Sequence, residues 1–250
     1  WEAAIDIAPA LEIDLWKGAK ATLQVAIPLW NNFKRDNSFD YIRPGFATLS
    51  QQLISNQWIE ANLTAGIFSQ NRNGVDLRAT AHLNKNLDLG FIAGYTGGWY
   101  VDDGKYKFCQ LDKLNLLFKA DYYEQNSKVQ VQLLAGKFVY GDMGARVDIS
   151  RHLAEYNIGV YGSLAKDDKD AGFFLSIPIG PKKMPKHGVV RARLTESMSW
   201  QQNMFNHGTY LQKHLGVMYK TAPNQGVGDK YWQPEYIQEY VVKYLNGVVK

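Results

Sequence analysis

Apolar and polar residues alternate along most of the chain, with a period of two residues. The segment 19–30 is a clear example, because alternate positions carry the apolar residues Ala19, Ala21, Leu23, Val25, Ile27 and Leu29. Lys20, Thr22 and Gln24 lie between them. Successive side chains of a β-strand point to opposite faces, so this pattern predicts a strand with one apolar and one polar face.

About twelve segments carry this period-two pattern. The predicted strands span residues 2–16, 19–30, 44–54, 57–69, 73–84, 86–99, 106–123, 127–140, 143–151, 155–165, 171–179 and 188–197. Most connections between them are rich in Asn, Asp, Gly and Ser, as in 71–74 and 167–170, which is typical of turns. We therefore predict one all-β domain over residues 1–200.

Two all-β architectures fit these strands. A soluble sandwich buries its apolar faces, whereas a transmembrane barrel turns them to lipid and lines its lumen with polar faces. The barrel is favoured because many segments reach about nine residues, the length that a tilted strand needs to cross a bilayer. Charges of both signs also lie within the polar faces, as at Asp76 and Arg78 or at Arg146 and Asp148. Such pairs suit a lumen crossed by salt bridges. The sequence therefore predicts a transmembrane antiparallel β-barrel of about twelve strands in the bacterial outer membrane.

Aromatic residues gather near the ends of the predicted strands. They are Trp16, Trp30, Tyr41, Trp58, Trp99, Tyr100, Tyr122, Tyr123, Phe138 and Tyr140. Membrane barrels carry such residues as girdles at the two lipid–water interfaces, and we expect the set to form them. For each aromatic residue alone, ordinary packing is the alternative.

The alternation fades in residues 201–250, which we predict to be an irregular tail. Within it, apolar residues at helical spacing predict an amphipathic helix near 234–249. Pro234 suits the start of that helix. The helix could plug a lumen, lie at a membrane surface, dock a partner or pack against its own domain.

Charge and composition narrow the chemistry. The formal net charge is only +4 and the basic residues are scattered, which argues against nucleic-acid binding. Cys109 is the only cysteine, so no disulfide can form within the chain. The five histidines lack the spacing of a metal site, and no nucleophile elbow or phosphate-binding loop is present. We therefore predict a non-enzymatic protein with no catalytic residues, no metal site and no cofactor.

A series of short motifs matches a known family in order along the chain. They are Leu15-Trp16-Lys17-Gly18-Ala19, Gln24-Val25-Ala26-Ile27-Pro28-Leu29-Trp30-Asn31-Asn32, Ile42-Arg43-Pro44-Gly45, Ala65-Gly66-Ile67-Phe68, Asn71-Arg72-Asn73-Gly74-Val75-Asp76, Gly94-Tyr95-Thr96-Gly97, Ala135-Gly136-Lys137-Phe138-Val139-Tyr140-Gly141-Asp142-Met143-Gly144-Ala145, Ser150-Arg151 and Gly172-Phe173-Phe174-Leu175-Ser176-Ile177-Pro178-Ile179. The ordered set resembles the YjbH family of outer-membrane β-barrel proteins, which are associated with exopolysaccharide and capsule production. The connection 165–171 departs from the family pattern because it is short and rich in lysine. Family members are also usually much longer than this chain.

The resemblance implies a barrel accessory to export or assembly of a surface exopolysaccharide or capsule. Its implied partners are outer-membrane lipid and periplasmic or lipoprotein components of a polysaccharide or secretion machine. If the lumen conducts an acidic polymer, basic residues of the polar faces become candidate contacts: Arg78, Lys119, Arg146, Arg191 and Arg193. The alternative function is a structural or scaffold subunit of a multi-protein outer-membrane secretion complex. A conduit would have an open lumen, whereas the lumen of a scaffold would be filled by side chains.

Overall fold

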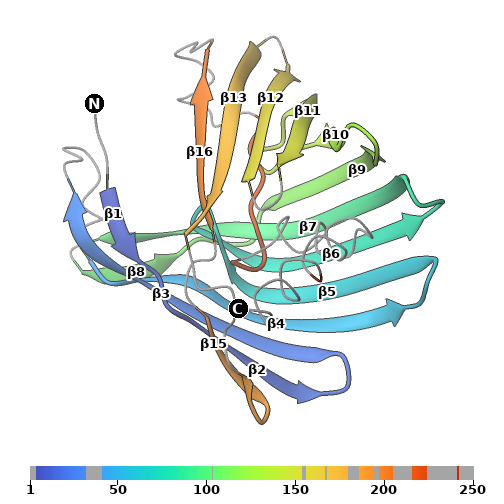
Figure 1. Ribbon diagram of the computed structural model, residues 1–250. Helices are drawn as coiled ribbons and strands as arrows, with labels where there is room; N and C mark the ends of the chain where they lie inside the picture. Colours follow the sequence, from blue (N-terminus) through green and yellow to red (C-terminus); the bar gives the residue numbers. More distant parts are fainter. Residues whose placement is uncertain are drawn as a thin grey trace, which may run out of the picture.

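The protein is described by a computed structural model over residues 4–31, 41–102, 104–153, 156–166, 168–179, 186–193, 197–204, 216–223 and 241. Its strands are β1 (Ala4–Ile7), β2 (Ala10–Trp16), β3 (Ala19–Asn31), β4 (Arg43–Ser55), β5 (Ile59–Phe68), β6 (Arg72–His82), β7 (Leu87–Asp102), β8 (Lys105–Phe108), β9 (Lys113–Glu124), β10 (Val129–Lys137), β11 (Met143–Leu153), β12 (Tyr156–Ala165), β13 (Asp168–Pro178), β14 (Lys186–His187), β15 (Val190–Arg193) and β16 (Ser197–Asn203). They form one large, strongly curved antiparallel sheet (Figure 1).

Strands that are consecutive in the sequence are mostly neighbours in the sheet. The order is β14-β15-β2-β3-β4-β5-β6-β7-β9-β10-β11-β12-β13-β16, while β1 pairs with β3 and β8 with β7. Among the described residues, no helix is long and apolar enough to cross a membrane. The all-β prediction is confirmed.

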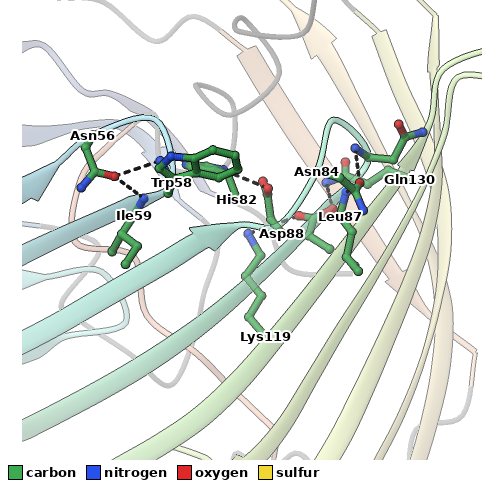
Figure 2. A network of polar contacts seen from close by, with 11 residues as sticks. Asn56, Trp58, Ile59, His82, Asn84, Leu87, Asp88, Lys119 and Gln130 are labelled. Carbon is green, nitrogen blue, oxygen red and sulfur yellow. Dashed lines mark hydrogen bonds and ion pairs between the residues drawn. The ribbon is translucent and has the colours of Figure 1, made fainter.

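Tight turns join several neighbouring strands, and asparagine side chains close two of these turns. Asn56 Oδ1 accepts hydrogen bonds from the backbone N–H groups of Trp58 and Ile59, at 2.9 and 2.7 Å. Asn84 Oδ1 accepts in the same way from the N–H of Leu87 at 2.9 Å (Figure 2). An asparagine side chain that binds its own following backbone fixes a turn, which sets the register of the β4–β5 and β6–β7 hairpins.

The period-two pattern separates the two faces of the sheet. On β12, Ile158, Val160 and Leu164 are 49%, 53% and 46% exposed. Asn157 and Ser163 point to the opposite face and are 8% and 7% exposed. We call the apolar, exposed side the outer face. The inner face is the polar, more buried side, whose residues include Thr22, Thr48, Asp76, Asn115, Asp148 and Ser163.

The predicted strands differ from the observed ones at a few places. The segment 2–16 is interrupted between β1 and β2, where Pro9 cannot donate a hydrogen bond to the sheet. The segment 106–123 divides into β8 and β9, and β8 pairs back onto β7. The prediction also omitted β16, whose pattern is short. In place of the strand predicted over 188–197, the structure has β14 and the four-residue β15. Together, these four differences give sixteen strands among the described residues, against about twelve predicted.

The two edges of the sheet are connected through the chain. β14 and β15 lie at one edge beside β2, whereas β16 pairs with β13 at the other. Arg193 ends β15 and Ser197 begins β16, so these edges are at most about 14 Å apart there. Within the described residues no pairing joins β16 to β14, so the hydrogen-bonded closure of the predicted barrel is not found.

Aromatic side chains occupy both faces, which corrects part of the predicted girdle. Six members of the predicted set are exposed, namely Trp16, Trp30, Tyr41, Trp58, Tyr100 and Tyr122. Trp99, Tyr123 and Phe138 are buried, and Tyr140 is half-buried. Tyr123 directly follows Tyr122 in a strand, so the two must point to opposite faces.

Most of the tail predicted over 201–250 lies outside the described residues. That holds for the helix predicted near 234–249, of which only Val241 is described. Residues 216–223 are described, and they have an irregular backbone on the concave side of the sheet (Figure 1).

Candidate functional site

Oppositely charged side chains pair on the inner face. Arg78 Nε lies 2.6 Å from Asp76 Oδ1 within β6. Arg146 Nη2 lies 2.8 Å from Asp148 Oδ1 within β11, and the guanidinium is 4.2 Å from the ring centroid of Tyr161. Both charge pairs predicted from the sequence are therefore in contact. Their pairing leaves little uncompensated charge on this part of the inner face.

Lys119 belongs to a second polar group, in the middle of the sheet. Its Nζ lies 3.2 Å from Asp121 Oδ2. The same carboxylate accepts hydrogen bonds from Gln130 Nε2 at 2.6 Å and Gln132 Nε2 at 2.9 Å. Gln130 Oε1 lies 2.8 Å from His152 Nε2, which continues the group onto β11. Figure 2 shows Lys119 and Gln130 beside the turn that joins β6 to β7.

The two arginines of β15 lie at the edge of the sheet. Arg193 Nε is 2.8 Å from Glu12 Oε1, and Lys20 Nζ is 3.8 Å from the other oxygen of that carboxylate. Arg191 is the cross-strand partner of Glu12 and so points to the inner face as well. All five basic residues proposed as polymer contacts thus share one face, but they lie on four strands and do not form one cluster. Their contact with a polymer stays a prediction.

The most enclosed group on the inner face is built around Tyr219, from the segment 216–223. Asp76 of β6, Gly94 of β7 and Asn115 of β9 are direct cross-strand neighbours on one row of the sheet. The Tyr219 hydroxyl donates to Asp76 Oδ2 at 2.7 Å and lies 3.1 Å from Asn115 Oδ1. We call Asp76, Gly94, Asn115 and Phe68 the tyrosine seat.

Gly94 creates the space for the phenol. A Cβ atom at this position would overlap the Tyr219 hydroxyl and the Asn115 side-chain oxygen. Because Gly94 has no side chain, the Tyr219 hydroxyl can lie between the Asp76 carboxylate and the Asn115 amide. No motif in the sequence predicts a binding role for this glycine.

Apolar contacts hold the ring of Tyr219. It stacks on Phe68 with ring centroids 5.1 Å apart and an angle of 7° between the planes. Val139 and Met218 join the same packed group, and Met218 also contacts a second buried group that includes Leu117. An offset aromatic pair contributes about 0.5–1.5 kcal/mol of stability beyond the contribution of the apolar area that it buries.

Backbone contacts fix both ends of the segment. The N–H of Gly216 donates to Asp142 Oδ2 at 2.7 Å. The N–H of Lys220 donates to Ser69 Oγ at 2.7 Å, and the N–H of Ser69 donates to the carbonyl of Lys220 at 3.1 Å. Arg78 Nη2 donates to the carbonyl of Tyr219 at 3.2 Å. Together with the Tyr219 hydroxyl, these contacts attach the segment to β6, β9, the turn after β5 and the turn after β10.

The seat has the chemistry of a hydroxyl-binding site. Burial raises the pKa of Tyr219 above its ordinary value of 10.0, and the adjacent Asp76 carboxylate raises it further. The phenol is therefore a neutral hydrogen-bond donor at neutral pH. In the part of the chain that the structure describes, no group of three or more His, Cys, Asp or Glu residues could hold a metal ion.

The sequence placed Asp76 correctly on a polar face but did not identify the rest of the seat. Asn115 is a polar position between Leu114 and Leu116, which predicts no contact, and the segment containing Tyr219 has no clear pattern. Aligning the predicted hairpins would have put Asp76, Gly94 and Asn115 on one row. Nothing in the local pattern places Tyr219 above them.

Comparisons of this chain with protein-family models, curated proteins and solved structures find no match. The assignment of a function therefore depends on the residues and geometry described above.

Proposed function

We propose that the protein is an integral β-barrel of a bacterial outer membrane, with its outer face in lipid and its inner face around the lumen. The observation that carries this proposal is the apolar outer face. Large apolar side chains are exposed on most strands from β3 to β12, for example Leu23, Leu49, Leu63, Val75, Phe91, Phe118, Ile149 and Val160.

Energetics favour lipid as the surroundings of that face. Removing a side chain such as Val160 from water contributes about 1.5–3 kcal/mol, and soluble monomers rarely expose large continuous apolar surfaces. The inner face has the opposite composition, because Asp76, Asn115 and Asp170 are almost fully buried there. A polar interior inside an apolar wall is the arrangement of outer-membrane barrels.

Closure of the sheet belongs to this proposal. Neighbours along the sheet are antiparallel throughout, so β14 and β16 at its two ends run in opposite directions. The short connection between Arg193 and Ser197 keeps the end of β15 within about 14 Å of the start of β16. Antiparallel pairing across this seam would close the β14-to-β16 path into a ring with an even number of strands, as is usual for bacterial barrels.

The barrel's proposed role is accessory to the export or assembly of a surface exopolysaccharide or capsule. The inner face supports this role because amide, carboxylate and hydroxyl groups, among them Gln130, Gln132 and Asn157, can exchange hydrogen bonds with sugar hydroxyls. The paired charges of Arg78 and Arg146 make the inner face suitable for neutral as well as acidic polymers.

A second candidate role is a scaffold subunit of a multi-protein outer-membrane secretion complex. The observation that favours it is the segment 216–223, which covers the inner face over β5, β6 and β9. A filled interior suits an anchor better than an open conduit.

Fractionation of expressing cells tests the membrane assignment. The full chain, exported by a signal peptide, should enter the outer membrane and migrate differently on a gel before and after boiling. Recovery in the soluble periplasmic fraction with no mobility shift would contradict the barrel. Loss of surface polysaccharide on deletion of the gene would favour the export role, whereas loss of a secreted protein would favour the scaffold role.

A further inference from the structure

We propose that the tyrosine seat is a subsite for one pyranose unit of a polysaccharide, and that Tyr219 is an internal ligand which occupies it until the polymer displaces the segment 216–223. This inference rests on the proposed function and adds a location, a ligand class and a means of control.

The seat has more hydrogen-bonding capacity than a phenol can use. The Tyr219 hydroxyl has one proton, which it donates to Asp76 Oδ2 because that acceptor is charged and lies nearer than Asn115 Oδ1. Asn115 is fully buried, and its Nδ2 has no hydrogen-bond partner among the described residues. Rotating the Asn115 amide by 180° would give Nδ2 a partner in the Tyr219 hydroxyl but would leave Oδ1 without one. A ligand with two adjacent hydroxyls would satisfy both Asp76 and Asn115.

The shape of the seat fits a sugar ring. Phe68 presents the flat face of its ring to Tyr219. A pyranose has C–H groups on its faces and hydroxyls around its edge, so it can stack on Phe68 while its edge points toward Asp76 and Asn115. Binding sites commonly combine an aromatic surface with a few well-placed polar groups in this way. Gly94 leaves the edge room to enter.

The charge in the seat is already balanced. Asp76 uses Oδ1 to bind Arg78 and keeps Oδ2 for the ligand. The carboxylate is therefore oriented by its own ion pair and does not need a cationic ligand. The recognised features are a ring face and an adjacent pair of hydroxyls, which neutral and acidic pyranoses share.

The attachment of the segment suits displacement. Besides the Tyr219 hydroxyl, the backbone of Gly216 and Lys220 forms hydrogen bonds with Asp142 and Ser69. Asp142, which receives the Gly216 N–H, also keeps a buried oxygen without a partner among the described residues. Near each buried carboxylate that the segment contacts, one polar atom therefore lacks a partner among the described residues: Asn115 Nδ2 beside Asp76, and Asp142 Oδ1. The hydroxyl groups of a polysaccharide could form hydrogen bonds with both atoms.

Binding measurements with two defined oligosaccharides test the subsite. Maltohexaose and a galacturonic acid hexamer are titrated into detergent-refolded protein, with folding checked by heat-modifiable mobility. Tyr219→Ala should bind at least one of them tenfold or more tightly than the unaltered chain. Adding Asn115→Ala to that variant should remove the gain. The proposal is wrong if neither oligosaccharide binds Tyr219→Ala more tightly, or if the gain persists without Asn115.

A second measurement keeps the seat intact. A nitroxide is attached at Lys220→Cys in a Cys109→Ala background, since the Lys220 side chain is exposed and Cys109 is the chain's single free thiol. Saturating oligosaccharide should increase the mobility of the label, and unchanged mobility would overturn the displacement. The membrane assignment is scored separately by heat-modifiable mobility, so its failure is distinguishable from failure of the subsite.

Discussion

The two faces of the same strands are stabilised in different ways. On the outer face of β12, Ile158 and Val160 are about half exposed, so few protein atoms surround them. On the inner face, Asp76 and Asn115 are buried and contact Tyr219 from a distant part of the chain. In the same sheet, the stability of the outer face thus depends on the surrounding solvent, whereas the stability of the inner face depends on specific side-chain contacts.

The largest expected effect comes from a charge on the outer face. Val160→Arg should destabilise the protein by about 2–4 kcal/mol in lipid, because an arginine in the middle of a strand faces the centre of the bilayer. Urea unfolding in lipid vesicles measures the loss. If the outer face met water, an arginine at this exposed position would change stability by no more than about 0.5 kcal/mol. Val160→Leu is the control and should be close to neutral in lipid.

A side chain added at Gly94 should have the next largest effect on stability. Gly94→Ala places a methyl group where the Tyr219 hydroxyl and Asn115 lie, so we expect a loss of about 1–3 kcal/mol and release of the segment 216–223. The matched control is Gly162→Ala, because no atom lies within 4 Å of a Cβ built there. Equal unfolding free energies for the two variants would mean that Tyr219 does not occupy the seat.

Removal of the phenol hydroxyl should cost less. Tyr219→Phe keeps the stacking on Phe68 but takes away the donor to buried Asp76, for an expected loss of about 1.5 kcal/mol. Tyr122→Phe is the control, since its hydroxyl donates to Glu124 at an exposed site. Unfolding of both variants under one condition checks the difference, and a larger loss for Tyr122→Phe would contradict the buried role of Tyr219.

The titration of Tyr219 should have the smallest effect, because it changes the docking of the segment 216–223 only at high pH. Its pKa in the folded protein is raised by burial and then by Asp76, so its contribution to docking is complete below pH 10 and is lost as the pH rises beyond that. A nitroxide at Lys220→Cys should therefore become more mobile above pH 10. The same label in a Tyr219→Phe background should show no such transition.

The inner and outer faces also differ in how far the sequence predicts them. Segments such as 57–69 and 155–165 were predicted within two residues of β5 and β12, because strand periodicity is a local property. The ion pairs Asp76–Arg78 and Arg146–Asp148 were also anticipated, since residues two apart share a face.

The seat could not be predicted in this way. Tyr219 and Asp76 are 143 residues apart, and the segment 216–223 has no periodic pattern that would orient it. The local pattern also missed the interruption between β1 and β2 at Pro9. It missed the break between β8 and β9 as well, because residues 109–112 contain no glycine or proline.

The central claim is that the outer face of the sheet lies in lipid, and a spin-label scan along β12 tests it most directly. Each position from Tyr156 to Ala165 is changed to cysteine in the Cys109→Ala background and labelled in lipid vesicles. Collisions with lipid-soluble oxygen should peak at positions 158, 160, 162 and 164, and collisions with an aqueous nickel chelate should be low there. The opposite result, with the nickel chelate reaching 158 and 160 freely, would contradict the membrane barrel.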